Sequence, residues 1–565
     1  MAIIKHIKYS VFVALTAFSF NAAEAQTNIP GQADPGRIQD RVEERDFLSR
    51  DNPQIAIPEF QEQVAPSGSD DIKLTLDNVV IEDQTKYDPE ELRSVYAEYL
   101  NKQVSLTDIY TIANALTVKY RNDGFILTQV IVPPQTIESG TVTLRAVEGY
   151  VDRVTVDGDD LSAFPLIQSY VDDLVNQVPL DSAKLERGLL LINDLPGVTA
   201  RSILSPSREN VGAANLRIII ERDPYEFFAG IDNFGTRFLG PLQLSGGVRV
   251  NQIAGLNNSL LFQFVGAPDD GLELGFGGLT YEHFVGSYGT KITANFSRTD
   301  TRPGFDLEAL GIEGRSSDYG IAVSHPFIRS RNTNWNVRLG IDARDLRSES
   351  DIAETVEDRL RTVRLGTSFN FLDTTLGVAF NAFDIEFSQG LAALGATNNS
   401  DNRTRSAADA SFSKLNIEFQ RLQNIYRNVN LLVAGRGQYS NAPLLSSEEF
   451  GIGGLQFGRG FDPSEIIGDE GFAGKVELQW NTPYELGLFD NYQVFTFYDA
   501  GRVFNDDAVT SDEDRDTVTS FGVGLRGDIT SEVSTDVILA FPLNRDVETQ
   551  RDRDPRLLLG FSARF

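Results

Sequence analysis

The sequence predicts a transmembrane antiparallel β-barrel of about sixteen strands, preceded by two periplasmic repeats of β-α-α-β-β order. Three observations carry this prediction. Residues 225–565 consist of long segments in which apolar and polar residues alternate, residues 71–224 contain the same order of strands and helices twice, and the chain opens on a secretory signal.

The barrel prediction depends on the length of the alternating segments. In GFAGKVELQW, residues 471–480, every second residue from Phe472 to Trp480 is apolar or glycine, while charged, polar or small residues fill the positions between. A tilted membrane strand needs about 9 to 11 residues, whereas strands of soluble sandwiches usually run to about 5 or 6. The pattern therefore favours an outer-membrane barrel over a soluble sandwich.

The alternating segments number about sixteen, an even number that is typical of single-chain bacterial barrels. The last segment, RLLLGFSARF, alternates up to a terminal aromatic residue, Phe565, as outer-membrane barrels commonly do. We predict strands that begin near Tyr225, Leu242, Ser259, Leu272, Tyr288, Ser317, Trp335, Asp358, Thr375, Ala410, Arg427, Gly471, Tyr492, Asp516, Glu532 and Arg556.

Two tandem units precede the barrel, at residues 71–149 and 150–224. The first has a strand in IKLTLDNVVI, two helices capped by Asp88 and Ser105, and two further strands, and the second repeats this order. Such a unit places a strand edge beside a helix, where an extended chain can add as an extra strand. The alternative is that the repeats are only spacers.

The N-terminal part of the chain contains no core pattern. Residues 1–25 combine two lysines, a short apolar run and a final Ala-Glu-Ala, which predicts a cleavable secretory signal; the alternative is an N-terminal membrane anchor. Residues 26–48 contain a short charged helix around Pro35 to Phe47, which on its residues alone reads as a solvated tail. Residues 49–70, rich in Pro, Gln and Ser, form a linker that we expect to be poorly ordered.

The composition argues against several function classes. The chain has no cysteine, and the two histidines behind the signal, His283 and His325, lie in strand-like stretches far from a Ser, Asp or His partner. A formal net charge of −31 argues against a nucleic-acid partner, and the sequence contains no nucleotide-binding motif. We therefore expect no enzyme, no catalytic residue, no cofactor and no metal site.

Two longer stretches and two short motifs resemble those of one family. The stretches are VPPQTIESGTVTLRAVEGYVDRV at 132–154 and LLLINDLPGV at 189–198. The motifs are a loop motif of Gly458, Arg459, Gly460 and Phe461 and a strand motif of Phe497, Asp499 and Gly501. The chain resembles the outer-membrane transporters of two-partner secretion, of the haemolysin-activator and filamentous-haemagglutinin-transporter type, which carry two POTRA (polypeptide-transport-associated) repeats before a sixteen-stranded barrel. Gly458 departs from the β-branched residue that is usual in the loop motif.

The resemblance implies a protein of the Gram-negative outer membrane that recognises an unfolded exoprotein in the periplasm and translocates it to the cell surface. Its partners would be that exoprotein, built of β-helical repeats, and the lipids of the outer membrane, with no nucleic acid and no nucleotide. The resemblance also gives the helix of residues 26–48 a role as a plug of the resting lumen.

The resemblance further places the connection 440–470 inside the barrel. Period-two alternation puts Phe497 and Asp499 on one strand face, opposite a face of Val494, Thr496 and Tyr498 that suits lipid, so Asp499 points into the lumen. The guanidinium of Arg459 can present a planar fork of donors to that carboxylate. We predict that this pair locks the loop to the barrel; the alternative is an ordinary glycine-rich loop.

Two other functions stay open. A barrel-assembly insertase would share the loop motif and the superfamily, although insertases usually carry more than two POTRA repeats. A passive porin-like channel would need neither the repeats nor the loop motif.

Overall fold

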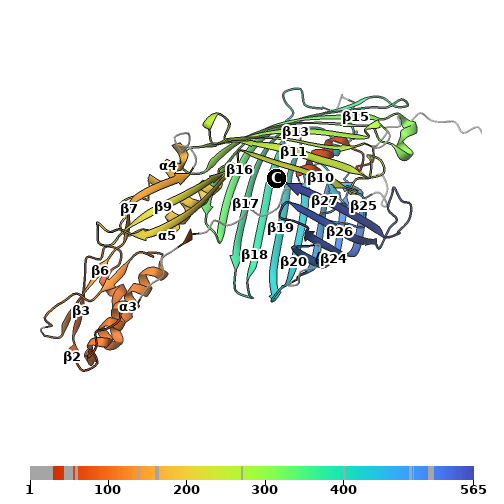
Figure 1. Ribbon diagram of the computed structural model, residues 1–565. Helices are drawn as coiled ribbons and strands as arrows, with labels where there is room; N and C mark the ends of the chain where they lie inside the picture. The colour runs from red at the N-terminus through yellow and green to blue at the C-terminus, as the bar shows by residue number, and fades with distance from the viewer. Residues whose placement is uncertain are drawn as a thin grey trace, which may run out of the picture.

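A computed structural model describes residues 29–43, 55–56, 62–137, 139–158, 165–172, 174–268, 271–398, 402–482, 487, 489–506 and 514–565. The predicted secretory signal lies outside the described residues. The molecule is a barrel with an arm of two small domains on one side (Figure 1). The first domain forms the far end of the arm, and the second lies between it and the barrel.

Sixteen antiparallel strands form a closed barrel, which confirms the predicted fold. The predicted strand starts are close to those observed, and the largest offsets are four residues, for Ser317 against Glu313 and Thr375 against Ala379. The strands are β10 (Tyr225–Asp232), β11 (Gln243–Asn251), β12 (Asn258–Ala267), β13 (Leu274–Val285), β14 (Thr290–Thr301), β15 (Glu313–Arg329), β16 (Thr333–Glu349), β17 (Val356–Asp373), β18 (Ala379–Gly390), β19 (Ser413–Tyr426), β20 (Val429–Ser440), β23 (Glu470–Asn481), β24 (Asn491–Phe504), β25 (Arg515–Asp528), β26 (Val533–Pro542) and β27 (Arg556–Arg564).

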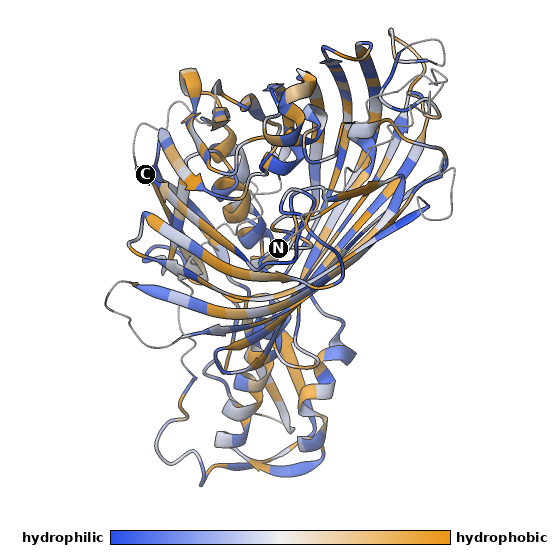
Figure 2. Cartoon of the chain, turned by 90° about the vertical axis from the view of Figure 1, so that its right-hand side faces the viewer, coloured by the Kyte–Doolittle hydropathy of each residue, from blue (hydrophilic) through white to orange (hydrophobic). Residues whose placement is uncertain are grey.

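Alternation along each strand separates the two faces of the barrel, as the hydropathy colours show (Figure 2). On β23 the side chains of Phe472, Leu478 and Trp480 are exposed on the outer face, whereas Glu477 and Gln479 are buried on the inner face. The inner residues are buried because other parts of the chain fill the lumen. An outward-facing apolar surface on a closed barrel is typical of barrels that span a lipid bilayer.

The first repeat differs in detail from its prediction. The stretch IKLTLDNVVI forms two strands and not one, because the backbone N–H of Asp77 donates to the carbonyl of Gly140 (2.8 Å) and ends the first pairing. The predicted helix caps at Asp88 and Ser105 are present. The elements are β2 (Lys73–Leu76), β3 (Asn78–Glu82), α2 (Pro89–Tyr96), β4 (Lys102–Ser105), α3 (Leu106–Asn122), β5 (Gln129–Ile131) and β6 (Thr141–Val147).

The second repeat has the predicted order of elements. Its strands pair in the order β8, β9, β7, and the buried faces of two helices cover one side of the sheet. No helix in the described part of the chain is long and apolar enough to cross a membrane. The elements are β7 (Tyr150–Gly158), α4 (Pro165–Asp172), α5 (Ser182–Asn193), β8 (Val198–Pro206) and β9 (Ala213–Arg222).

The second repeat is seated on the periplasmic turns of the barrel. Asp194, at the end of α5, accepts two hydrogen bonds from Arg329 at the end of β15, both of 2.8 Å. Arg187 donates to the carbonyl of Pro326 (3.0 Å) beside that contact. Because both partners sit on regular elements, this joint fixes how the repeat meets the barrel mouth.

The described residues of the linker lie against both repeats. The two-residue strand β1 (Ile55–Ala56) pairs in parallel with the outer edge of β8. In the first repeat, the side-chain amide of Asn114 on α3 accepts from the N–H of Gln63 and donates to its C=O, both at 3.1 Å. These linker residues are therefore hydrogen-bonded in this structure, which differs from the poor order that we expected.

Candidate functional site in the barrel lumen

The connection between β20 and β23 folds back into the barrel, as predicted for residues 440–470. Two short strands, β21 (Phe450–Ile452) and β22 (Ile466–Gly468), pair with each other and carry the tip between them. Gly453, Gly454 and Gly458 all have positive φ angles, of 127°, 81° and 95°. A Cβ on Gly453 would lie 1.9 Å from the carbonyl oxygen of Asp462, so the reversal at this point requires glycine.

Arg459 is fixed at the tip of this loop by a carboxylate from β24. Its Nε donates to Asp499 Oδ2 (3.0 Å) and its Nη2 to Oδ1 (2.8 Å), while the backbone N–H groups of Gly458 and Arg459 donate to Oδ2. Arg459 is 1 % exposed and Asp499 is fully buried. The guanidinium carbon also lies 3.5 Å from the ring centroid of Phe497. The structure thus brings together the charged residues of the two predicted motifs.

A second carboxylate completes the charge balance around Arg459. Glu477 on β23 accepts from Arg459 Nη1, and it also pairs with Arg526 on β25 at 2.8 Å. Two arginines therefore face two carboxylates. The alternation in the sequence put Glu477 on the face opposite Phe472 and Trp480 but did not connect it to Arg459, because the pairing register that sets Glu477 opposite Phe497 is not visible in the sequence.

The remaining motif residues pack closely around this cluster. A Cβ on Gly460 would lie 2.8 Å from Ser520 Cβ, and one on Gly501 would lie 2.6 Å from Ile452 Cδ1, so the loop and the wall approach to contact distance at both glycines. Phe461 is 1 % exposed and belongs to an apolar cluster with Ile452. The whole motif set therefore lies at one interface between loop and wall.

Four further loop carboxylates, which the sequence analysis missed, also bind cations of the wall or of other loops. Glu448 accepts from Arg364 (2.8 Å) and Lys414 (2.7 Å). Arg405 pairs with both Glu449 (2.9 Å) and Asp469, and Arg556 pairs with Asp462. These cations are far from the loop in sequence, so only the folded barrel brings them together.

We expect Glu448→Ala to loosen the inward loop while the barrel stays folded. The substitution leaves Arg364 and Lys414 without their shared carboxylate, and removing one partner of a buried pair costs about 3 to 5 kcal/mol. The measurement is the rate of protease cleavage within residues 441–469 of the purified protein. Glu532→Ala, which removes an exposed carboxylate from a periplasmic turn, is the matched control. Equal cleavage of both variants would contradict the anchor role.

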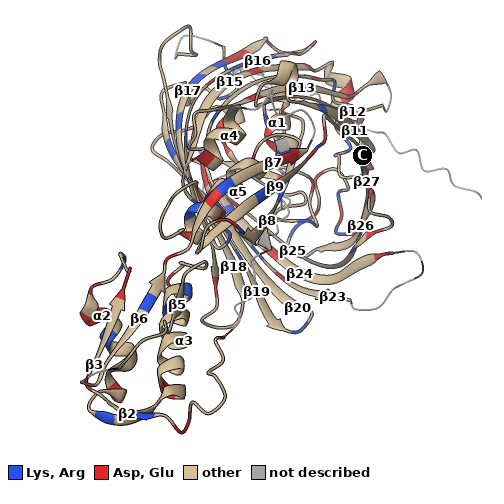
Figure 3. Cartoon of the chain, turned by 60° about the vertical axis from the view of Figure 1, so that its left-hand side comes forward, with Lys and Arg blue, Asp and Glu red and all other residues tan. Residues whose placement is uncertain are grey.

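The described part of the N-terminal helix lies inside the ring of strands (Figure 3). It consists of the 3₁₀ turn η1 (Pro35–Arg37) and α1 (Ile38–Glu43). Arg37 Nη1 donates to the carbonyls of Ser446 and Glu449, both at 2.9 Å, and both belong to the inward loop. The helix is therefore bound to the same loop that carries Arg459.

Polar contacts also join this helix to the barrel wall. Gln39 accepts from Ser297 on β14 (2.8 Å), and Asp40 lies 3.4 Å from Arg344 on β16. Gln32, just before the turn, donates to Glu465 of the loop (3.0 Å). The Asp40–Arg344 pair is partly exposed and contributes little on its own, so the helix is held by the sum of these contacts.

The sequence profile of the haemolysin secretion/activation protein ShlB/FhaC/HecB family matches residues 216–527, more than half of the chain. The chain belongs to this family. The profile of the ShlB-type POTRA domain matches residues 74–149, which is the first repeat. The chain is therefore a two-partner secretion transporter of the outer membrane, with its POTRA repeats in the periplasm, and it acts with a secreted exoprotein.

Individual relatives cover nearly the same length. The heme/hemopexin transporter protein HuxB of Haemophilus influenzae (strain 86-028NP) is 24 % identical over 96 % of both chains. The outer membrane transporter CdiB of Escherichia coli O6:K15:H31 is 22 % identical over 88 % of this chain and 84 % of its own. Among solved structures, CdiB from Escherichia coli matches with a TM-score of 0.72 at 19 % identity, covering 94 % of this chain and 97 % of that one, which shows the shared fold.

Proposed function

We propose that this transporter holds its inward loop in the working position through Arg459, Asp499 and Glu477, and that residues 26–48 close the lumen while no exoprotein is in transit. The observation that carries the proposal is the burial of Arg459 between two carboxylates from different strands. A buried cation with two charged partners resists displacement much more than an exposed pair does. The loop is thereby held at one place on the wall.

The two POTRA repeats, in this proposal, receive an extended segment of the exoprotein. The outer edge of β8 and the groove beside α3 both accept an extended chain here, because residues 55–56 and Gln63 of the linker occupy them. On β5 the N–H of Val130 already donates to the hydroxyl of Thr117 on α3 (2.9 Å), so it cannot pair with an added strand. The groove of the first repeat would therefore bind the backbone of the exoprotein through Asn114 and not through a full ladder of strand hydrogen bonds. This refines the strand addition expected from the sequence.

The exoprotein is proposed to be a long chain of β-helical repeats that folds only after it leaves the barrel. Folding outside the cell would then supply the direction of transport, since no nucleotide-binding motif occurs in the sequence. Each repeat that folds prevents the chain from sliding back.

The test is secretion of the partner exoprotein. With the transporter present, that exoprotein should reach the surface, and the reconstituted full-length transporter should retain its unfolded N-terminal segment better than an unrelated unfolded chain. Retention of both chains alike would remove the recognition role. A general loss of outer-membrane proteins after deletion of the transporter would instead indicate an insertase.

A further inference from the structure

A belt of charged side chains covers the outer face of the barrel at the extracellular ends of β14 to β17. These side chains follow the exposed, lipid-facing positions of each strand, outward of Phe296 on β14 and Tyr319 on β15. Six arginines and five carboxylates make up this arginine belt: Arg298, Arg302, Arg315, Arg347, Arg359, Arg361, Asp300, Glu313, Asp345, Glu349 and Glu357. It carries one net positive charge in a chain whose formal net charge is −31.

Aromatic side chains fix the height of the belt relative to the membrane. Phe327 lies beside Trp335 at the periplasmic end of β15, and Phe296 lies beside Tyr319 towards the other end, with ring centroids 5.1 Å apart in each pair. From Phe327 to Tyr319 a tilted strand rises about 20 Å, close to the ~25 Å apolar band of such barrels. Arg315 lies about 10 Å beyond Tyr319 on the same estimate. The belt therefore lies at the level of the outer-leaflet headgroups.

Positive charge is concentrated on the membrane side of the belt. Residues that pair across the four strands form rows. The row next to the aromatic pair Phe296 and Tyr319 contains Arg298 and Arg359, with Asp345 between them. The outermost row sets Glu313 directly opposite Glu349. The belt is thus basic where lipid phosphates lie and acidic further out.

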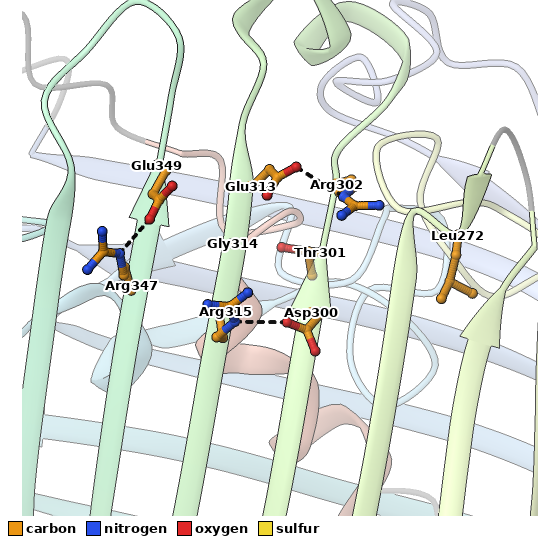
Figure 4. A pocket seen from close by; sticks show the side chains of 9 residues that line it. All are labelled: Leu272, Asp300, Thr301, Arg302, Glu313, Gly314, Arg315, Arg347 and Glu349. Atoms are coloured by element: carbon orange, nitrogen blue, oxygen red, sulfur yellow. Dashed lines mark hydrogen bonds and ion pairs between the residues drawn. The ribbon is translucent and has the colours of Figure 1, made fainter.

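The middle row contains an unusual pair of like charges. Arg315 on β15 is directly opposite Arg347 on β16, an arrangement that destabilises a sheet unless something else neutralises it. Each arginine turns away from the other: Arg315 donates through Nε to Asp300, while Arg347 pairs with Glu349 and Glu357. Arg315, Arg347, Asp300 and Glu349 line a hollow of about 240 Å³ at this end of the strands (Figure 4).

Donors remain available in this hollow. Within the described part of the chain, Arg315 and Arg302 each use only Nε in the hydrogen bonds to their carboxylates, Asp300 and Glu313. The terminal nitrogens of a guanidinium form the fork that binds phosphate in a planar, two-bond arrangement. The neighbouring strand β13 presents Gly275, Gly277 and Leu279 on the same face, so the belt ends at β14 on that side.

From these observations we propose that the arginine belt binds the phosphate groups of the phosphorylated glycolipid that forms the outer leaflet. One phosphate lies between Arg315 and Arg347 and accepts from the terminal nitrogens of Arg315, which its bond to Asp300 leaves unused, and the arginines of the membrane-side row contact the phosphates next to it. The belt would orient the barrel against its lipid on the β14 to β17 side. This role is separate from exoprotein transport and from the inward loop.

The test measures binding of lipid A with two phosphates to the full-length protein in detergent, by native mass spectrometry. We expect the double variant Arg315→Gln with Arg347→Gln to lose about tenfold or more in affinity, since hydrogen bonds to charged groups are the strong ones. The control is Arg545→Gln with Arg553→Gln, which removes two arginines from exposed ion pairs of the β26–β27 loop region and should bind as the unmodified protein does.

Two further arms keep the outcome decisive. The first arm uses only the unmodified protein, so it does not depend on the folding of a variant. This protein should bind lipid A without phosphates no more tightly than the double variant binds lipid A with two phosphates. Inorganic phosphate at the same concentration should not compete. Equal binding of both lipids, or equal binding by the double variant, would overturn the proposal. Full competition by inorganic phosphate would show a site for free anions and would overturn the lipid assignment.

Discussion

Secretion of the exoprotein is expected to fall sharply when Arg459 is replaced by alanine. The change removes the arginine that pairs with Asp499 and leaves Glu477 with Arg526 as its remaining arginine partner. Losing one partner of a buried pair costs about 3 to 5 kcal/mol. Lysine at 459 should rescue only in part, because an ammonium keeps the charge but loses the planar fork that meets both Oδ atoms of Asp499. The barrel should still form, since its closure depends on the strand ladder.

A double-mutant cycle read by exoprotein release separates this lock from an ordinary loop. If the two residues share one function, Arg459→Ala combined with Asp499→Ala should secrete no worse than the poorer single variant. Arg545→Ala, which breaks an exposed pair with Asp516, is the control and should secrete normally. Strictly additive losses, or single variants that secrete normally, would contradict the lock.

Deleting residues 27–48 should raise the ion conductance of the protein severalfold in planar bilayers. An α-helix with its side chains is about 10 to 12 Å wide, and this one lies inside the ring of strands. Arg37→Ala alone should give brief openings, because the variant loses both hydrogen bonds from Nη1 to the loop but keeps the contacts of Gln39 and Asp40.

The matched control for Arg37→Ala is Arg208→Ala, which removes an exposed arginine from the second POTRA repeat, outside the lumen. It should leave the conductance unchanged. Heat-dependent gel mobility of each variant shows whether the barrel is folded. Conductance of the deletion variant equal to that of the full chain would remove the plug role and return residues 26–48 to a solvated tail.

The barrel was predictable because its signal is local. Alternation needs only neighbouring residues, so each strand start could be placed to within four residues. The pairing of Arg459 with Asp499 was predictable for a different reason. The two motifs resemble those of a family in which the loop lies inside the barrel, and the alternation along the strand places Asp499 on the inner face. No local pattern would have joined a loop arginine to a strand 40 residues away.

The other ion pairs that hold the loop depend on the strand register and on the closure of the barrel, neither of which can be read from the sequence. Arg364 meets Glu448 across 84 residues, and nothing in either segment marks the other as a partner. The split of the first strand at Asp77 has the same origin, because the carbonyl that ends it belongs to Gly140, at the start of a distant strand. The linker contacts of Gln63 likewise need the groove beside α3 to exist first.

The contact of Arg37 with two main-chain carbonyls has a consequence for how the chain tolerates change. Because the oxygens belong to the backbone, the side chains at 446 and 449 can vary without altering what Arg37 binds. The two carbonyls converge on one nitrogen only while the turn between them keeps its shape. Arg37 also donates through Nε to the side-chain hydroxyl of Ser464 in the loop (3.2 Å), so only this part of its contact depends on a loop side chain. A shift of the turn by about one hydrogen-bond length would release both carbonyl contacts together.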